Sequence, residues 1–129
     1  MRHEHSVQLR WSDPDSLGHV NHARALSLLE DARTALLGEG ADGPFPLILA
    51  RLEADYLRQL YYRVGERLVV RSYVVRLGGK SFTVRQELIQ DDEVAIRADV
   101  VMVAFDFDGD TSRPISDAER DRWGRYLGE

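Results

Sequence analysis

Residues 22–37 read HARALSLLEDARTALL, and the spacing of their apolar side chains predicts a buried helix. One apolar stripe repeats at i, i+3, i+4, i+7 and i+11 and consists of Ala25, Leu28, Leu29, Ala32 and Leu36. Leu26 and Ala35 widen this stripe, so we expect the helix to be covered on more than one side. Asn21 is a suitable N-cap, and Gly38 stands just past the predicted end.

The chain on both sides of this helix has the pattern of β-strands. Residues 5–11 alternate weakly before it, with Val7, Leu9 and Trp11 on one side. After the helix, three segments are rich in valine, tyrosine, threonine and phenylalanine, namely residues 66–77, 81–89 and 94–107. Gly78-Gly79 and the acidic residues 90–93 are the turns between them, which predicts an antiparallel meander.

Residues 47–60 fit a helix or a strand equally well by their period. We assign them as a fourth strand, because a helix there would leave the meander short of partners. Residues 38–46 are a loop by their glycines and prolines, and Ser116 with Glu119 has the spacing of a capping box before a short helix ending near Gly128. The prediction is an α+β fold in which a curved antiparallel sheet wraps around one long central helix.

The size and charge of the chain limit its classes of function. Its 129 residues fit one domain over 1–129, and the net charge of −5 without a basic run argues against nucleic acid as a partner. The charged start, MRHEHSVQLRW, has no apolar export signal, and no segment is long and apolar enough for a membrane span. Without cysteine, disulfides and thiolate zinc sites are excluded. We expect a soluble cytoplasmic protein.

The loop DPDSLGHVNH, residues 13–22, collects groups that move protons just before the helix begins. A helix start presents unpaired N–H groups and a partial positive charge, which suit the negative charge that develops on an attacked carbonyl. Asp15 is close enough to act beside those donors as nucleophile or base, and Gly18 permits close backbone approach or a positive φ. The alternative remains that Asp13 and Asp15 only form a turn, and that His19 and His22 are only polar residues at a helix end.

Two metal-binding interpretations are weaker. His19-x-x-His22 with the two aspartates lacks a third nitrogen ligand. The segment DFDGDTSRPISD from Asp106 imitates a calcium loop, but Thr111 stands where glycine is required and Asp117 where glutamate is expected. We therefore expect no metal at either place.

We expect the Glu30–Arg33 pair to be a salt bridge on the helix surface. If the helix is buried on several sides, the Glu30 carboxylate instead needs a partner or a function.

The stretch RWSDPDSLGHVNHARALSLLEDAR resembles the opening signature of the 4-hydroxybenzoyl-CoA thioesterase family, whose members are hotdog-fold acyl-CoA thioesterases. The matching positions are Arg10, Trp11, Asp13, Asp15, Gly18, Glu30 and Arg33. Later segments are similar in order along nearly the whole chain, as in ADYLRQLYYRVGERLVV, LGGKSFTVRQEL and VVMVAFDFDGDTSRPI.

The resemblance implies an acyl-CoA thioesterase with a hotdog fold that needs no cofactor or metal. Asp15 would be the catalytic carboxylate and His22 its neighbour at the helix start, with its backbone N–H near the thioester oxygen. The implied substrate-binding residues are Gly18, His19, Val20 and Asn21. A homodimer or homotetramer with the site at the subunit interface is implied as well. Ala25 departs from the family, since many relatives have an aromatic residue there.

Two rival functions stay open at this point, an enoyl-thioester hydratase and a protein that binds acyl-CoA without turning it over. Charge alone offers candidates for holding the CoA phosphates, which are Arg58, Arg63, Lys80 and Arg85.

Overall fold

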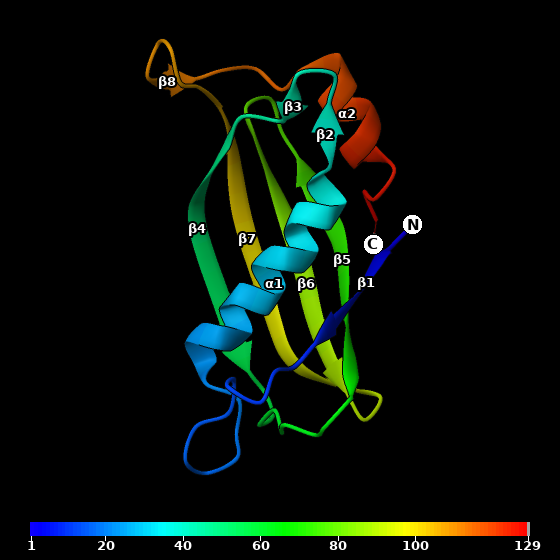
Figure 1. Ribbon diagram of the computed structural model, residues 1–129. Helices are drawn as coiled ribbons and strands as arrows, with labels where there is room; N and C mark the ends of the chain where they lie inside the picture. Colours follow the sequence, from blue (N-terminus) through cyan, green and yellow to red (C-terminus); the bar gives the residue numbers. More distant parts are fainter. Residues whose placement is uncertain (129) are drawn as a thin grey trace.

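The computed structural model describes residues 1–128 and contains one large antiparallel sheet with a helix across it. The strand order is β1 (His3–Gln8), β5 (Arg67–Leu77), β6 (Ser81–Gln90), β7 (Glu93–Asp106) and β4 (Leu47–Tyr56). Figure 1 shows helix α1 (His22–Leu37) lying along the inner face of this curved sheet. The predicted architecture is therefore confirmed.

Helix α1 has the predicted bounds because both of its ends carry local stop signals. Asn21 Oδ1 accepts the backbone N–H of Ala23 at 2.8 Å, which caps the first turn. Gly38 has a φ of +71° and donates its N–H to Thr34 O, which ends the last turn. The five residues of the predicted apolar stripe are all buried.

The core lies between α1 and the inner face of the central strands. The inward residues of β5 and β6 are wholly buried, namely Val70, Val74, Phe82, Val84 and Leu88. Asp91 and Asp92 take positive φ angles of 55° and 61° in the turn between β6 and β7, a conformation that Asp tolerates better than most residues. This turn keeps β6 and β7 adjacent and antiparallel.

The ambiguous segment 47–60 is a strand, as assigned, although it ends at Tyr56. The predicted loop after α1 holds two short paired strands, β2 (Glu39–Gly40) and β3 (Gly43–Pro44). A further short strand, β8 (Thr111–Ser112), pairs with the end of β7. None of these short strands changes the order of the main sheet.

The first predicted strand is partly wrong. Val7 and Leu9 are buried as expected, but β1 ends at Gln8 and Trp11 is 82% exposed. Asp13 donates its N–H to Arg10 O at 2.9 Å, so the chain has already turned at Trp11. The alternation of apolar residues in the sequence continues past the end of β1. The turn after the strand, and not the alternation, determines the direction of the Trp11 side chain.

Helix α2 (Asp117–Gly124) closes the end of the sheet where α1 finishes, as Figure 1 shows. The predicted capping box of Ser116 and Glu119 is confirmed, whereas the helix stops at Gly124 rather than near Gly128. Trp123 is wholly buried, stacks on Phe82 with ring centroids 4.2 Å apart, and donates its indole N–H to Leu37 O. These contacts hold the last turn of α1 against the sheet.

The expected salt bridge of Glu30 and Arg33 is present, but only Glu30 lies on the helix surface. The Arg33 side chain is only 5% exposed, while Glu30 is 72% exposed and its carboxylate stays 3.9 Å away. Arg33 also donates to Gln86 Oε1 at 3.0 Å, and Gln86 in turn donates to Leu29 O and Ser72 Oγ. Burial lowers the pKa of Arg33. The three-residue spacing places the two residues side by side on one helix. It does not show whether that side of the helix is exposed or buried.

The calcium-like segment from Asp106 begins with a polar turn. Asp106 Oδ1 accepts the backbone N–H groups of Asp108 and Gly109 at 3.1 Å and 3.2 Å. Within residues 1–128, neither helix has the length and apolar character that crossing a bilayer requires.

Candidate active site

The two aspartates before α1 have different environments. Asp13 is 3% exposed and accepts hydrogen bonds from the backbone N–H of Arg10 at 2.7 Å and from Arg24 Nε at 2.6 Å. Burial alone would raise the pKa of Asp13, but these two donors outweigh it and lower the pKa. Asp13 therefore fastens the segment before α1 to the first turn of that helix.

Asp15 is exposed and stands at the start of a tight loop. Its Oδ1 accepts the backbone N–H groups of Leu17 at 2.9 Å and His19 at 3.3 Å. Its own N–H donates to His19 O at 2.7 Å, and Gly18, with a φ of +80°, donates to Asp15 O. A positive φ is a conformation that glycine adopts without steric cost, so Gly18 allows the loop to close. Both bonds to the carboxylate fall on one oxygen.

The loop is held against the segment that follows β4. Val20 donates its N–H to Leu60 O at 2.8 Å, and Tyr62 donates to Gly18 O at 3.4 Å. The ring of His19 meets the ring of Tyr61 edge to face, with centroids 5.0 Å apart. Two elements far apart in sequence thus form one rim.

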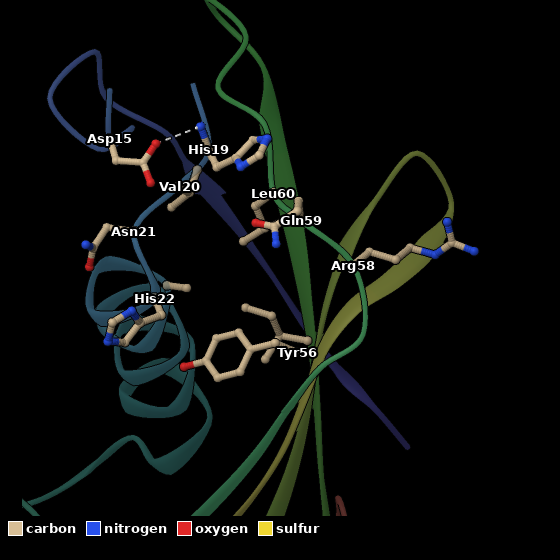
Figure 2. Close-up of a pocket in the computed structure, with 11 residues that line it drawn as sticks. Asp15, His19, Val20, Asn21, His22, Tyr56, Arg58, Gln59 and Leu60 are labelled. Carbon is tan, nitrogen blue, oxygen red and sulfur yellow. Dashed lines mark hydrogen bonds between the residues drawn. The ribbon is translucent and has the colours of Figure 1, made fainter. Parts of the chain in front are cut away.

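A pocket of about 260 Å³ opens between this rim and the start of α1. In Figure 2, Asp15, His19, Asn21 and His22 lie on the side of the loop and helix start, and Tyr56 and Gln59 lie across from them. The Arg58 side chain extends away from these residues and forms an ion pair with Glu93. Of the predicted site residues, five line the pocket, namely Asp15, His19, Val20, Asn21 and His22. Gly18 is not among the lining residues and shapes the loop behind them.

The first amide of α1 belongs to His22, at the pocket wall. Within residues 1–128 it donates to no acceptor, whereas the next amide, of Ala23, is taken by Asn21. The unpaired N–H groups at a helix start carry a partial positive charge, so this point of the pocket favours a negative charge. The His22 ring meets Tyr56 edge to face at a centroid distance of 6.4 Å.

Sequence reasoning missed Tyr56 and Gln59 on the opposite wall, and Leu60 and Ile96 on the floor. Tyr56, Gln59 and Leu60 come from the end of β4 and the segment after it, and Ile96 comes from β7. No local motif marks these residues, because sheet pairing and the chain's return past the helix bring them to the pocket. The strand register that places Tyr56 opposite Ile96 could have identified them, but this register is known only once the fold is known.

Of the four basic residues proposed for the CoA phosphates, only Arg58 lines the pocket. Arg63 is bound to Asp91 and Arg85 to Asp99, each through two hydrogen bonds. Lys80 lies in the turn between β5 and β6, which Figure 1 shows at the opposite end of the sheet from the start of α1.

A metal-binding cluster is not found in the part of the chain that the structure describes, residues 1–128. Asp13, which the metal hypothesis would need, is bound by Arg10 and Arg24.

Solved structures with this architecture include several thioesterases. A predicted thioesterase from Bacillus stearothermophilus is 25% identical, with a TM-score of 0.89 over 100% of this chain and 98% of its own. A thioesterase from Thermus thermophilus, complexed with coenzyme A and Zn, is 31% identical, with a TM-score of 0.79 over 92% of this chain and 94% of its own. A protein from Staphylococcus aureus in complex with CoA shares the fold at 14% identity, with a TM-score of 0.85 over 100% and 87%.

Comparison with curated proteins gave no match. The family model described as the thioesterase superfamily matches residues 17–96, which include most of the loop, all of α1 and the pocket wall after β4. More than half of the chain therefore fits the model. Together with the curved sheet around α1, this match shows that the chain belongs to the thioesterase superfamily and is a hotdog-fold thioester hydrolase.

Proposed function

We propose that the protein hydrolyses acyl-CoA thioesters to a free acid and CoA, with Asp15 as the catalytic carboxylate. The observation that carries this proposal is that Asp15 and His22 line one pocket, and that the backbone N–H of His22 donates to no acceptor among residues 1–128. The complexes of the Thermus and Staphylococcus proteins with coenzyme A support CoA as the carrier of the acyl group.

Asp15 could catalyse hydrolysis in one of two ways. As a general base, Asp15 takes a proton from water while the water oxygen attacks the thioester carbon. As a nucleophile, Asp15 attacks that carbon itself and water later cleaves the acyl–carboxylate bond. In both cases the C–S bond breaks and the departing CoA sulfur receives a proton. The hydrogen bonds from Leu17 and His19 fix the carboxylate in place for either role.

The start of α1 would stabilise the negative charge on the carbonyl oxygen. One N–H donor at such a position is worth about 3 kcal/mol of the barrier, or two to three powers of ten in rate. The backbone N–H of His22 is the donor that the geometry offers. In this proposal Gly18 closes the loop, His19 and Val20 hold it against residues 60–61, and Asn21 caps the helix.

We also propose that the working unit is at least a dimer formed along β4. This strand pairs only with β7 among the described residues, so its other edge presents unpaired N–H and C=O groups. A long exposed edge is a template for pairing with another strand. Tyr56, at the end of β4, lines the pocket, so a partner strand would lie beside the site. A homotetramer would then arise from two such dimers.

Hydrolysis of a panel of acyl-CoA thioesters, followed by thiol release, tests the proposal. Asp15→Asn keeps a side-chain oxygen for the loop hydrogen bonds but loses the charge, so we expect thiol release to fall by about 100-fold or more. Asp42→Asn makes the same change in an exposed turn away from the pocket and is the matched control. Equal rates for wild type and Asp15→Asn would refute the role of Asp15, and a hydrated product without free thiol would refute hydrolysis.

A further inference from the structure

The pocket changes from polar to apolar with depth. Its rim consists of exposed side chains, among them Asp15, Asn21, His22, Tyr56 and Gln59. Its floor consists of four buried apolar residues, which are Val20 at 8%, Ala25 at 1%, Leu60 at 3% and Ile96 at 1% exposure. A molecule that enters the pocket therefore meets hydrogen-bonding groups first and only carbon surfaces at the end.

Two backbone N–H groups of this floor already have acceptors. Val20 donates its N–H to Leu60 O at 2.8 Å, and Ala25 donates its N–H to Asn21 O at 3.0 Å. A hydroxyl or carboxylate that reached the floor would lose its water, and neither of these two N–H groups could replace that water. Leaving such a group unpaired costs about 1–3 kcal/mol for a neutral group and more for a charged one.

Ala25 is the floor residue that α1 contributes. It lies three residues after His22 on α1, so the two positions are neighbours on one helix face. An acyl group whose carbonyl faces the His22 N–H would run along this face toward the Ala25 methyl. The part of the pocket that one chain forms has a volume of about 260 Å³, below the range of about 300–1,000 Å³ that holds drug-sized ligands.

We propose that the acyl group is small, apolar and unsubstituted at its far end, and that Ala25 sets its size limit. This inference rests on the proposed acyl-CoA hydrolysis for its ligand, but it concerns the pocket floor and not the catalytic step. It assigns to Ala25, Leu60 and Ile96 the choice between acyl groups. Thioesters of dicarboxylic acids or of hydroxylated acids are then poor substrates.

Binding of stable thioether analogues tests this selectivity without depending on turnover. The probes are S-methyl-CoA, S-butyl-CoA and S-(3-carboxypropyl)-CoA, measured by calorimetry on the full-length wild-type protein. We expect S-butyl-CoA to bind more tightly than S-methyl-CoA, and S-(3-carboxypropyl)-CoA to bind at least about tenfold more weakly than S-butyl-CoA. Equal affinity for the butyl and carboxypropyl probes, or no binding of any probe, would overturn the inference.

Substitution at position 25 tests the size limit. Ala25→Leu fills the floor, and we expect it to weaken S-butyl-CoA binding by about tenfold while S-methyl-CoA binding is unchanged. Ala25→Val makes a smaller change of the same kind and is used if the leucine variant does not fold. Ala35→Leu is the matched control, because it lies later on the same helix and outside the pocket.

The outcomes separate this inference from the proposed function. If no acyl-CoA is hydrolysed but the butyl preference and its loss in Ala25→Leu are seen, the hydrolytic function fails and the pocket assignment holds. If hydrolysis depends on Asp15 but Ala25→Leu affects the methyl and butyl probes equally, the function holds and the size limit is wrong.

Discussion

Arg24 Nε donates a hydrogen bond of 2.6 Å to Oδ1 of Asp13, which ties the first turn of α1 to the chain before it. Asp15, two residues later, is exposed and lines the pocket. Two aspartates with nearly the same place in the sequence therefore have separate tasks, one in the fold and one in the site. This separation gives the first prediction.

Asp13→Asn should lower stability, and Asp15→Asn should lower activity. The first change removes a buried charge from its two arginine donors, and we expect the free energy of unfolding at pH 7 to fall by about 1–3 kcal/mol. The second leaves the melting temperature near that of wild type because Asp15 is exposed. Urea unfolding and thiol release on both variants check this crossed pattern, and a stability loss confined to Asp15→Asn would contradict it.

Local patterns were enough to predict much of the fold. The bounds of α1, its Asn21 cap and the capping box at Ser116 all depend on residues within a few positions of one another. Such signals are complete in the sequence because their hydrogen bonds close within one helical turn. The strand at residues 47–56 was harder, since only the need of the sheet for a partner decided it.

Burial of charge could not be predicted in the same way. Arg33 can be buried because it donates a hydrogen bond to Gln86, a residue of the sheet that lies 53 residues later in the chain. The spacing of Glu30 and Arg33 is the same on a covered and an open helix face. Likewise the roles of Asp13 and Asp15 differ because Arg24 reaches only the first.

The candidate site was predictable on one side only. The loop from Asp15 to His22 is contiguous, so its residues were found together. The wall at Tyr56 and the floor at Ile96 depend on the register between β4 and β7 and on the return of the chain past the helix.

Glu119→Gln should destabilise the protein at neutral pH. It should also reduce the loss of unfolding free energy on acidification. Glu119 is 1% exposed and forms two hydrogen bonds of 2.7 Å with Arg113. Burial would raise the pKa of Glu119, but Arg113 and the Ser116 bonds lower it below the usual 4.5. We expect a loss of about 3 kcal/mol at pH 7, the lower end for breaking a buried pair.

The pH dependence follows from the direction of that shift. A lowered pKa means that the folded state binds fewer protons than the unfolded state, so this stabilisation is present above pH 4.5 and is lost as the pH falls through the folded pKa. The gap between wild type and Glu119→Gln should therefore shrink on acidification below pH 4.5. Urea unfolding at several pH values measures it, with Glu39→Gln on the exposed part of β2 as control. A gap that stays constant would contradict the assignment.

His3 should make the fold sensitive to mild acid. Its Nδ1 is buried without a hydrogen-bond partner, and its ring packs against His5 and Tyr126. Burial, and then the charges of His5 and Arg122, lower the pKa of His3 below 6.5. The unfolded chain then binds a proton that the folded protein resists, so stability falls as the pH drops below 6.5 toward the folded pKa.

His3→Phe keeps a ring in this position and removes the titration. We expect the decline in unfolding free energy between about pH 7.5 and about pH 5.5 to be smaller in His3→Phe than in wild type, as measured by urea unfolding. Tyr126→Phe retains His3 and its ring neighbour, so it should keep the wild-type slope. Identical slopes for His3→Phe and wild type would show that another group is responsible.

Leu49→Lys should separate the proposed subunits. Leu49 is 45% exposed on β4, at the register shift before Arg51. A lysine on an edge strand disfavours pairing with a second strand, because its charge would lose water as the other strand approached. We expect wild type to sediment as a dimer or larger and Leu49→Lys to shift to the monomer. Thiol release should fall in parallel, because the pocket lies beside β4.

Val64→Lys is the control for this prediction. It adds the same charge at an 88% exposed residue away from β4 and should leave both sedimentation and thiol release unchanged. An unchanged sedimentation of Leu49→Lys would rule out this edge as the interface.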